Sequence, residues 1–356
     1  MAGKRTTQAD VARLAGVSRA TVSLVLNPGS SSRVPISDET RQRVLRAVHE
    51  LGYTPNPVAQ MLAGGRNNLI GVFVYLREFP IEQQDFFYYY LLGIERGAQA
   101  ANYNLVLFTG SPTPGNRHIY LNGQNSLNLA AGSILLGGEP DRDELCNLMQ
   151  EGYPFVYIGR REVSGCQIDW VTNDYKQGSF EAARHLIDLG HKQIGIVGLQ
   201  IHLESHVDRL AGCQMAADQA GDVTLTVLDV DERSRPGCLL QAIRSQGITA
   251  LICHDDHSIE AVTPILDGAG FRAPGDLSVV LLSPADHVGN TLQNPTRVEF
   301  DRAAVGEAAV HMLVARLKGG CVGPQQLVLP CTFVVGSTTA RPRRSVADHV
   351  EDQMSC

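Results

Sequence analysis

Several chemical signatures are absent from this 356-residue sequence. No apolar run approaches the roughly 20 residues that a membrane-spanning helix needs. The first ten residues, MAGKRTTQAD, lack the apolar segment of a signal peptide. The eight cysteines include no C-x-x-C pair and no closely spaced framework. We therefore expect a reduced, cytoplasmic protein that makes no contact with a membrane.

Motifs for nucleotide cofactors and for covalent catalysis are also missing. Neither G-x-G-x-x-G nor G-K-[ST] follows a strand-like run, and no G-x-S-x-G elbow is present. The densest polar cluster is CHDDHS at residues 253–258. Such contiguous side chains on a strand-to-helix turn alternate in direction and converge poorly on one metal ion. We expect a ligand-lining loop in which Asp256 caps the next helix, with no metal, no cofactor and no enzyme activity.

Charge is distributed unevenly along a chain whose formal net charge is −7. Residues 1–66 carry nine Lys and Arg against four Asp and Glu, and the rest of the chain is acidic. A small basic head on an acidic body indicates that the head binds a polyanion. Nucleic acid is the first candidate. A membrane surface is the second, but no lipidation motif or long basic amphipathic helix supports it.

Two short helices are predicted on either side of Gly16. Thr7 is suited to cap the first helix and Ser18 the second, and the glycine permits a tight turn between them. This is the pattern of a helix-turn-helix, whose second helix enters the major groove of DNA. An ordinary helical hairpin with a solvated polar face is the alternative. The predicted small core consists of Val11, Ala12, Val17, Val22 and Val25.

A third helix and a short hinge follow this pair. The segment SDETRQRVLRAVHELGY predicts a helix that Ser37 caps and Gly52 ends. Asn56 and Pro57 then predict the start of another helix of about seven residues, which is too short to be stable alone in water. It either forms on a partner or is a plain linker. A leucine on such a helix could insert between base pairs in a minor groove.

Beyond Leu69, strand-like runs alternate with helical stretches. The runs cover residues 69–76, 104–108, 132–138 and 154–159, then 193–198, 225–230, 250–253 and 277–283. Helical stretches include 175–190, 205–220, 256–270 and 301–318. This alternation predicts parallel sheets built from βαβ units, and the two series predict two Rossmann-type lobes. A ligand would bind between the lobes, at the carboxyl ends of the strands.

Longer segments resemble the lactose/galactose repressor (LacI/GalR) family. In the head these are TQADVARLAGVSRATVSLVLN and SDETRQRVLRAVHELGYTPNPVAQMLAGG, followed by LIGV. In the body they are VTNDYKQGSFEAARHLIDLGHKQIGIVG, DRLAGC and the run from TALICHDD to GDLSVV. The similarity covers residues 6–341. The body alone is also similar to periplasmic sugar-binding proteins, so an intracellular sugar-binding or sugar-processing protein is the alternative.

The resemblance implies an α/β protein of defined organisation. An all-α helix-turn-helix head (1–54) precedes a hinge helix and linker (55–68) and a two-lobed, periplasmic-binding-protein-like core (69–341) for effector binding and dimerisation. The N-lobe is expected at about 69–165 plus 290–323, and the C-lobe at about 166–289 plus 324–341. The tail, 342–356, is expected to be disordered, and it has no leucine heptads for a tetramerisation coil.

The resemblance further implies a nucleoid-associated bacterial repressor of carbohydrate-utilisation genes. It would bind a pseudopalindromic operator in double-stranded DNA as a homodimer, under control of a sugar or sugar phosphate. The implied base-reading residues are Arg19, Ala20 and Leu24, and the implied phosphate contacts are Thr7, Ser18, Thr21, Ser23 and Asn27. The hinge contributes Asn56, Ala59 and the intercalating Leu62. The implied effector-binding residues are Phe86, Phe87, Arg160, Asn173, Arg209, Asp256 and Ser283.

Four positions depart from the family pattern. Ser283 stands where the family has an aspartate at the end of a strand, and Val335 replaces an arginine near the C-terminus. Ala131 replaces another aspartate, and Asn173 precedes Asp174 near the cleft. The departures at Ser283 and at Asn173–Asp174 leave the identity of the effector open without affecting the prediction of DNA binding.

Overall fold

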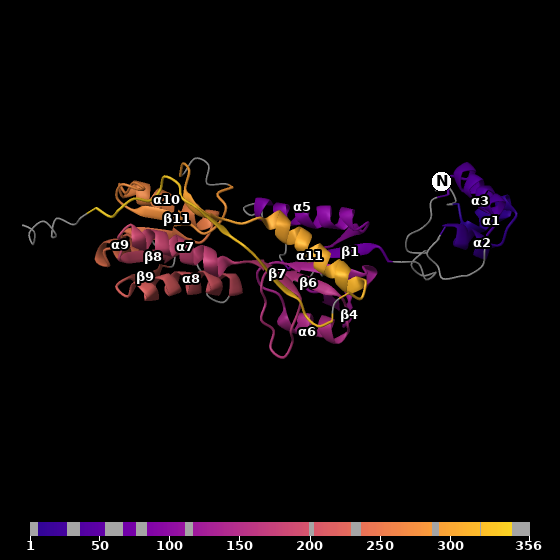
Figure 1. Cartoon of the computed structure of the whole chain (residues 1–356), viewed down its shortest axis with the longest axis horizontal. Coiled ribbons are helices and arrows are strands. Elements are labelled where there is room, and N and C mark those ends of the chain that lie inside the picture. Colours follow the sequence, from indigo (N-terminus) through magenta and orange to yellow (C-terminus); the bar gives the residue numbers. More distant parts are fainter. Residues whose placement is uncertain are drawn as a thin grey trace, which may run out of the picture. The chain divides into compact units, whose positions relative to one another are not determined.

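The computed structural model describes nine ranges of the chain, and the fold is built from these. They are residues 6–26, 36–53, 67–75, 84–110, 117–198, 203–228, 236–286, 292–320 and 322–343. Contacts separate two compact units, Met1–Asn68 and Leu69–Cys356 (Figure 1). The first unit contains the head, and the second contains both lobes of the body.

The head consists of helices α1 (Gln8–Ala15), α2 (Arg19–Leu26) and α3 (Asp38–Glu50). The predicted caps are confirmed, because the hydroxyls of Thr7, Ser18 and Ser37 accept backbone N–H groups three residues ahead. Gly16 adopts φ +64°, the left-handed conformation that ends α1 and starts the turn. All five predicted core residues pack in one cluster, four of them buried and Val17 partly buried.

The N-lobe is a parallel sheet of six strands in the order β13-β7-β6-β5-β1-β2. Its strands are β1 (Leu69–Val74), β2 (Asn104–Phe108), β5 (Gly132–Leu136), β6 (Phe155–Ile158), β7 (Trp170–Asn173) and β13 (Gln326–Leu329). The small hairpin β3 (Tyr120–Leu121) and β4 (Gln124–Asn125) leads into a 3-10 turn, Ser126–Leu129.

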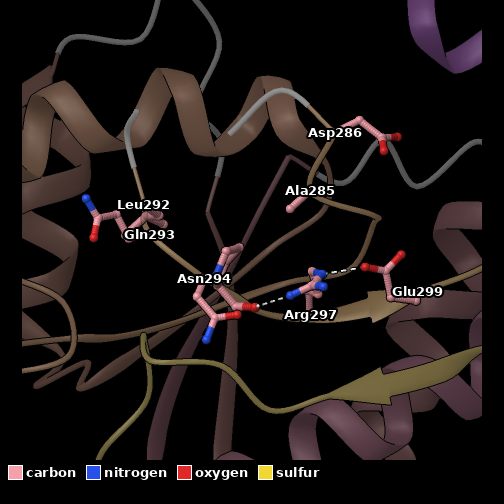
Figure 2. Close-up of a pocket in the computed structure, with 8 residues that line it drawn as sticks. Ala285, Asp286, Leu292, Gln293, Asn294, Arg297 and Glu299 are labelled. Atoms are coloured by element: carbon pink, nitrogen blue, oxygen red, sulfur yellow. Dashed lines mark hydrogen bonds and ion pairs between the residues drawn. The ribbon is translucent and has the colours of Figure 1, made fainter. Parts of the chain in front are cut away.

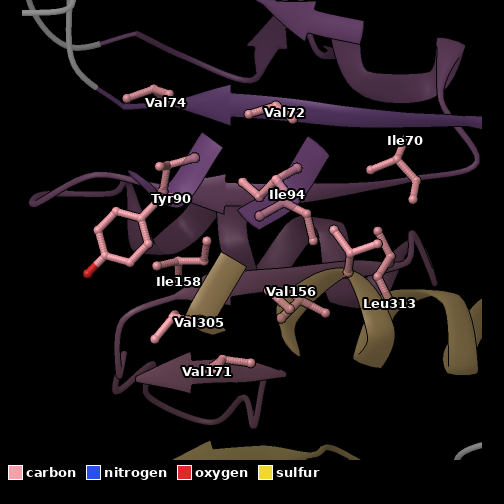
Figure 3. Close-up of a cluster of buried hydrophobic side chains, with 14 of the residues drawn as sticks. Ile70, Val72, Val74, Tyr90, Ile94, Val156, Ile158, Val171, Val305 and Leu313 are labelled. Atoms are coloured by element: carbon pink, nitrogen blue, oxygen red, sulfur yellow. The ribbon is translucent and has the colours of Figure 1, made fainter. Parts of the chain in front are cut away.

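Helices cover both faces of this sheet. Helices α5 (Gln84–Ala100) and α11 (Arg302–Leu317) bury their apolar sides against one face, as Figure 3 shows for Tyr90, Ile94 and Leu313. Helix α6 (Arg142–Gln150) packs on the other face through Leu145 and Leu148. A Cβ at Gly93 would collide with the carbonyl of Ala303, so α5 and α11 approach closely only because that residue is glycine.

The C-lobe repeats this design with the strand order β14-β12-β11-β10-β8-β9. Its strands are β8 (Gln193–Val197), β9 (Thr224–Leu228), β10 (Ala250–Cys253), β11 (Ser278–Leu281), β12 (Thr296–Glu299) and the antiparallel β14 (Thr332–Val334). Helices α7 (Tyr175–Asp188) and α8 (Glu204–Ala220) cover one face. Helices α9 (Pro236–Ser245) and α10 (Asp256–Gly268) cover the other.

The polypeptide crosses between the two lobes at positions other than those predicted. Strand β7 pairs with β6 and therefore belongs to the N-lobe, although residue 166 was the expected start of the C-lobe. Strand β12 pairs with β11 in the C-lobe, and β13 pairs with β7 in the N-lobe, each opposite to the prediction. The sequence of a four-residue strand is too short to indicate which of the two sheets the strand joins. Its membership depends instead on which sheet has an edge strand available for pairing.

The chain consequently crosses between the lobes three times: between β7 and α7, between β12 and α11, and between β13 and β14. These crossings place the carboxyl ends of β7 and β12 at the junction of the lobes. None of the described helices combines the length and apolar character that crossing a membrane requires.

Candidate functional site

The exposed start of α2 is the first candidate surface. Arg19 and Ala20 are exposed, and Thr21, Ser23 and Leu24 are half-buried. The first turns of α1 and α3 contain acidic residues, whereas that of α2 contains none. The partial positive charge of the α2 N-terminus is therefore reinforced by Arg19 and opposed by no carboxylate in that turn, which suits an anionic partner.

The second candidate site surrounds Arg209 at the junction of the lobes. Its guanidinium lies 3.7 Å from the ring centre of Tyr175 and 6.0 Å from that of Phe300, and these two rings meet edge to face. Tyr175 begins α7 and Phe300 directly follows β12, so both mark chain crossings. Tyr175 also neighbours Tyr90 on N-lobe helix α5, so the two lobes meet at these phenols. Burial and then this neighbour raise the pKa of Tyr90.

Two histidines lie beside this arginine. The rings of His206 and His254 are 3.8 Å apart, and both side chains are buried. Burial, followed by the charges of Arg209 and His206, holds the pKa of His254 well below its ordinary value. His254 is therefore neutral near pH 7, so one of its ring nitrogens is able to donate a hydrogen bond and the other is able to accept one.

Several buried polar atoms at this junction lack a hydrogen-bond partner among the described residues. They are Oδ1 and Nδ2 of Asn173, Nε of Arg209 and Nδ1 of His254. Asn173 ends β7 and His254 follows β10, so both lie at carboxyl ends of parallel strands. Because a buried polar atom without a partner costs about 1–3 kcal/mol, this group of atoms is suited to binding a polar ligand.

A group of ion pairs, which we call the clasp, joins the lobes beside this site. Arg160, after β6, donates to both carboxylate oxygens of Asp208 on α8, at 3.0 and 2.8 Å. Glu204, at the start of α8, accepts from Arg142 at 2.8 Å and from the backbone N–H of Glu162 at 3.1 Å. Burial opposes ionisation of Glu204, but this N–H and the nearby arginines still lower its pKa.

Comparison with known proteins identifies the family. Residues 7–56 match the bacterial regulatory proteins of the lacI family, and residues 183–339 match the periplasmic binding protein-like domain. The chain is 30% identical over 339 residues to the HTH-type transcriptional regulator CelR of Thermobifida fusca, covering 93% of this chain and 98% of that protein. The chain belongs to the LacI family. It is a DNA-binding transcriptional regulator, as its head predicted.

Further LacI-family relatives agree with this assignment. The ribose operon repressor of Haemophilus influenzae is 29% identical, covering 92% of this chain and 97% of that one. The structure of a CelR–cellobiose complex aligns with a TM-score of 0.61 at 26% identity, over 94% of this chain and 100% of the other. The lac repressor dimer bound to operator and the anti-inducer ONPF shares the fold. It aligns with a TM-score of 0.75 at 24% identity, over 95% of this chain and 100% of that one.

The structure brings together some of the LacI-family effector residues expected from the sequence. Ser283 donates to Asp256 at 3.1 Å, so the serine that replaces the family aspartate contacts the neighbouring acid. The expected helix cap was wrong by one residue: Asp255 caps α10 by accepting from the N–H of Ser258 at 2.8 Å. Asp256 is instead the first helical residue, and its carboxylate accepts from Ser283.

Other expected residues have different surroundings. Phe87 is buried in the N-lobe core cluster, and the aromatic rings beside Arg209 are those of Tyr175 and Phe300. Arg160 is engaged in the clasp. Asn27, Asn56, Ala59 and Leu62 lie outside the described residues, as does the side chain of Phe86.

Sequence reasoning missed Tyr175, Phe300 and His206. His206 precedes Arg209 by three residues on α8, a spacing that shares one helix face and could have indicated it. No comparable local signal marks the two rings, because Tyr175 and Phe300 are 125 positions apart in the chain and meet only through the crossings.

Two open cavities lie along the crossings. One of about 470 Å³ is lined by Tyr89, Pro284 and Phe300, among others, and so adjoins the Arg209 site. The other, of about 530 Å³, is lined by Ala285, Asp286 and side chains of the stretch from Leu292 to Glu299 (Figure 2). There Arg297 donates to the carbonyl of Pro295 at 3.1 Å and pairs with Glu299, so its charge is already compensated.

One grouping has the side chains of a metal site. His118 Nδ1 lies 3.4 Å from Glu144 Oε1 and 3.8 Å from Asp141 Oδ2. Both carboxylates already have structural roles, since Glu144 accepts from the backbone of Ile119 and Asp141 caps α6. In the cluster at 253–258, Cys253 is buried in the core and His254 faces His206, so these side chains point to different surroundings.

Proposed function

We propose that a sugar or sugar phosphate binds between the lobes around Arg209 and controls the binding of the head to operator DNA. The observation that carries this proposal is the set of unpartnered buried atoms of Asn173, Arg209 and His254 among the described residues. A hydroxyl group both donates and accepts, so a polyol could satisfy the amide oxygen, the guanidinium N–H and the imidazole together.

The rings around these atoms also fit a sugar. Tyr175 and Phe300 offer apolar surface to the C–H groups of a pyranose or furanose, while Asp256 and Ser283 offer further polar contacts. A CelR structure that aligns with this chain at 26% identity contains cellobiose. The uncharged Ser283 in place of the family aspartate favours a ligand different from those that require a carboxylate there.

On the DNA side, base reading belongs to the exposed surface of α2. Arg19 is suited to a bidentate contact with guanine, and Ala20 and Leu24 to apolar contact with a thymine methyl. Specificity then also depends on operator shape and on insertion of Leu62 into the minor groove. The proposed backbone contacts are Thr7, Ser18, Thr21, Ser23, Asn27, Asn56 and Ala59.

Control requires two heads held in a fixed spacing. We propose a homodimer whose paired heads lie about 34 Å apart, one turn of DNA, on a pseudopalindromic operator. A ligand that binds one arrangement of the lobes more tightly shifts the population toward it and changes this spacing. No turnover of the ligand is expected.

The test combines operator selection with a sugar panel. Full-length protein is used to select duplex DNA from a random pool, and gel shifts of the selected operator are then titrated with mono- and disaccharides and their phosphates. A sugar that changes the operator affinity, and is recovered unchanged, supports the proposal.

A truncated chain separates the two sites. Residues 67–356 should bind the same sugar by calorimetry and shift no operator. Specific DNA binding by that fragment would contradict the assignment of the head. Formation of a product would instead support the sugar-processing alternative.

A further inference from the structure

Two cysteines of the N-lobe lie side by side. Cys146 on α6 and Cys166 in the turn after Val163 have their sulfur atoms 2.6 Å apart, and both side chains are half-buried. The turn is closed by a hydrogen bond of 3.1 Å from the N–H of Cys166 to the carbonyl of Val163, with Gly165 at φ +75°. The backbone thus holds Cys166 against α6.

The other described cysteines have different surroundings. Cys213 and Cys253 are fully buried, and burial raises the pKa of each thiol to about 12, so both remain protonated and inert. Cys331 is half-buried, and burial likewise raises its pKa to about 12. Cys238 is exposed on α9. Among the described residues, Cys146 and Cys166 are therefore the two partly accessible thiols that lie next to each other.

This pair lies on the same two segments as the N-lobe half of the clasp. Arg142 precedes Cys146 by one helical turn of α6, and its guanidinium donates to the carbonyl of Glu162 as well as to Glu204. Glu162, four residues before Cys166, presents its N–H to the same Glu204. A covalent bond between α6 and the turn would hold both donors in the position that meets the C-lobe.

We propose that Cys146 and Cys166 are a reversible dithiol–disulfide site whose oxidation stabilises the clasp between the lobes. The oxidant is a low-molecular-weight disulfide. One cysteine thiolate attacks it, forming a mixed disulfide and releasing one small thiol. The second cysteine thiolate then attacks the mixed disulfide and releases the other small thiol. Both protein thiol protons end on the two released thiols, so the protein loses two electrons and the oxidant gains them.

The neighbouring sulfur of Cys166 and then burial raise the pKa of Cys146 to about 11. The 2.6 Å separation places each sulfur within reach of a mixed disulfide formed on the other. Disulfides of this kind in a reducing compartment are transient and serve as sensors rather than as structural links.

The first test is chemical. Full-length protein is equilibrated with oxidised glutathione, alkylated and digested without reduction for mass spectrometry. A peptide linking Cys146 to Cys166 is expected in the wild type and in the control Cys238→Ser, which removes the exposed thiol. Cys146→Ser and Cys166→Ser should yield no such link. Glutathione adducts on Cys146 or Cys166 that never resolve, or a link of either one to another cysteine, would overturn the site.

The second test addresses the clasp and needs no effector. Hydrogen exchange is compared between reduced and oxidised protein at residues 160–166 and 203–208. Oxidation should slow exchange in both segments of the wild type and of Cys238→Ser, and in neither segment of Cys166→Ser. If the linked peptide forms but exchange at 203–208 is unchanged, the connection to the clasp is wrong. Neither readout depends on the sugar assignment, so the two proposals fail separately.

Discussion

The guanidinium of Arg160 and the carboxylate of Asp208 form a two-point ion pair between the two lobes. Its N···O distances are 3.0 and 2.8 Å, and the side chains are 21% and 23% exposed. Arg160 follows β6 of the N-lobe sheet, whereas Asp208 lies on α8 of the C-lobe. Any separation of the lobes at this point must therefore break a bidentate, charge-assisted contact.

Removing the charge from this pair should favour separation of the lobes. Asp208→Asn is expected to weaken binding of the effector sugar by about 0.5–1 kcal/mol, roughly two- to fivefold, because the pair is partly solvated. Calorimetry at low and high salt measures this, and the difference should shrink at high salt. Asp188→Asn, which removes an exposed pair within α7, is the control. Equal effects of both variants would show that the contact between lobes is unimportant.

The planar guanidinium of Arg209 should matter more than its charge. Arg209→Lys retains the charge but loses the stacking on Tyr175 and the Nε donor, so ligand affinity should fall by about 1–2 kcal/mol. Operator affinity without ligand should stay unchanged in gel shifts. Arg244→Lys, on the exposed side of α9, is the matched control. An Arg209→Lys protein with a normal sugar titration would rule out this residue as a ligand contact.

Arg19 should carry sequence specificity. Arg19→Ala is expected to cost about 1–3 kcal/mol on the selected operator and much less on random DNA. Arg13→Ala removes an arginine that is 77% exposed on α1 and paired with Asp10, and should reduce binding to both DNAs alike. Fluorescence anisotropy on both duplexes separates these outcomes. Comparable losses on operator and random DNA for Arg19→Ala would make it a phosphate contact.

Stability should fall in mild acid because of His254. Its pKa in the folded chain lies well below the ordinary value of 6.5, so the unfolded chain binds more protons below that pH. Folding stability is then complete above pH 6.5 and declines as the pH falls, by up to about 1.4 kcal/mol per unit. Burial also lowers the pKa values of His185 and His191, which add to the decline.

Substitution identifies the contribution of this histidine. Urea unfolding of the full chain at pH 7.5, 6.5 and 5.5 should show a shallower pH dependence for His254→Gln than for the wild type. His257→Gln, at an exposed position on the same turn, should keep the wild-type slope. A His254→Gln slope equal to that of the wild type would mean that His254 does not control acid stability.

Local features of the head were predictable from sequence. Thr7, Ser18 and Ser37 cap their helices as expected. Each hydroxyl accepts a hydrogen bond from the backbone N–H three residues later, so the interaction depends only on one turn of the chain. The alternating runs of the body gave the α/β class and most strands for the same reason, since period and length are properties of short segments. Asp256 was misplaced by one residue because Asp255 offers the same cap chemistry.

Membership of a lobe was not predictable in the same way. Trp170–Asn173, Thr296–Glu299 and Gln326–Leu329 are strands of four residues, and each joins the sheet opposite to the one expected. Nothing within four residues identifies a neighbour strand. Each of these strands pairs with the sheet edge that lies beside it once the chain has crossed between the lobes.

The sequence by itself determined the family, the helix-turn-helix and the positions of Arg19 and Arg209, because these depend on local pattern and on motifs of fixed spacing. Only the tertiary structure decided what surrounds Arg209 and what holds the lobes together. Tyr175, Phe300 and His254 meet there from three separate segments, and Arg160 finds Asp208 across 48 positions of chain. Such contacts are set by packing between elements, which no single stretch of sequence encodes.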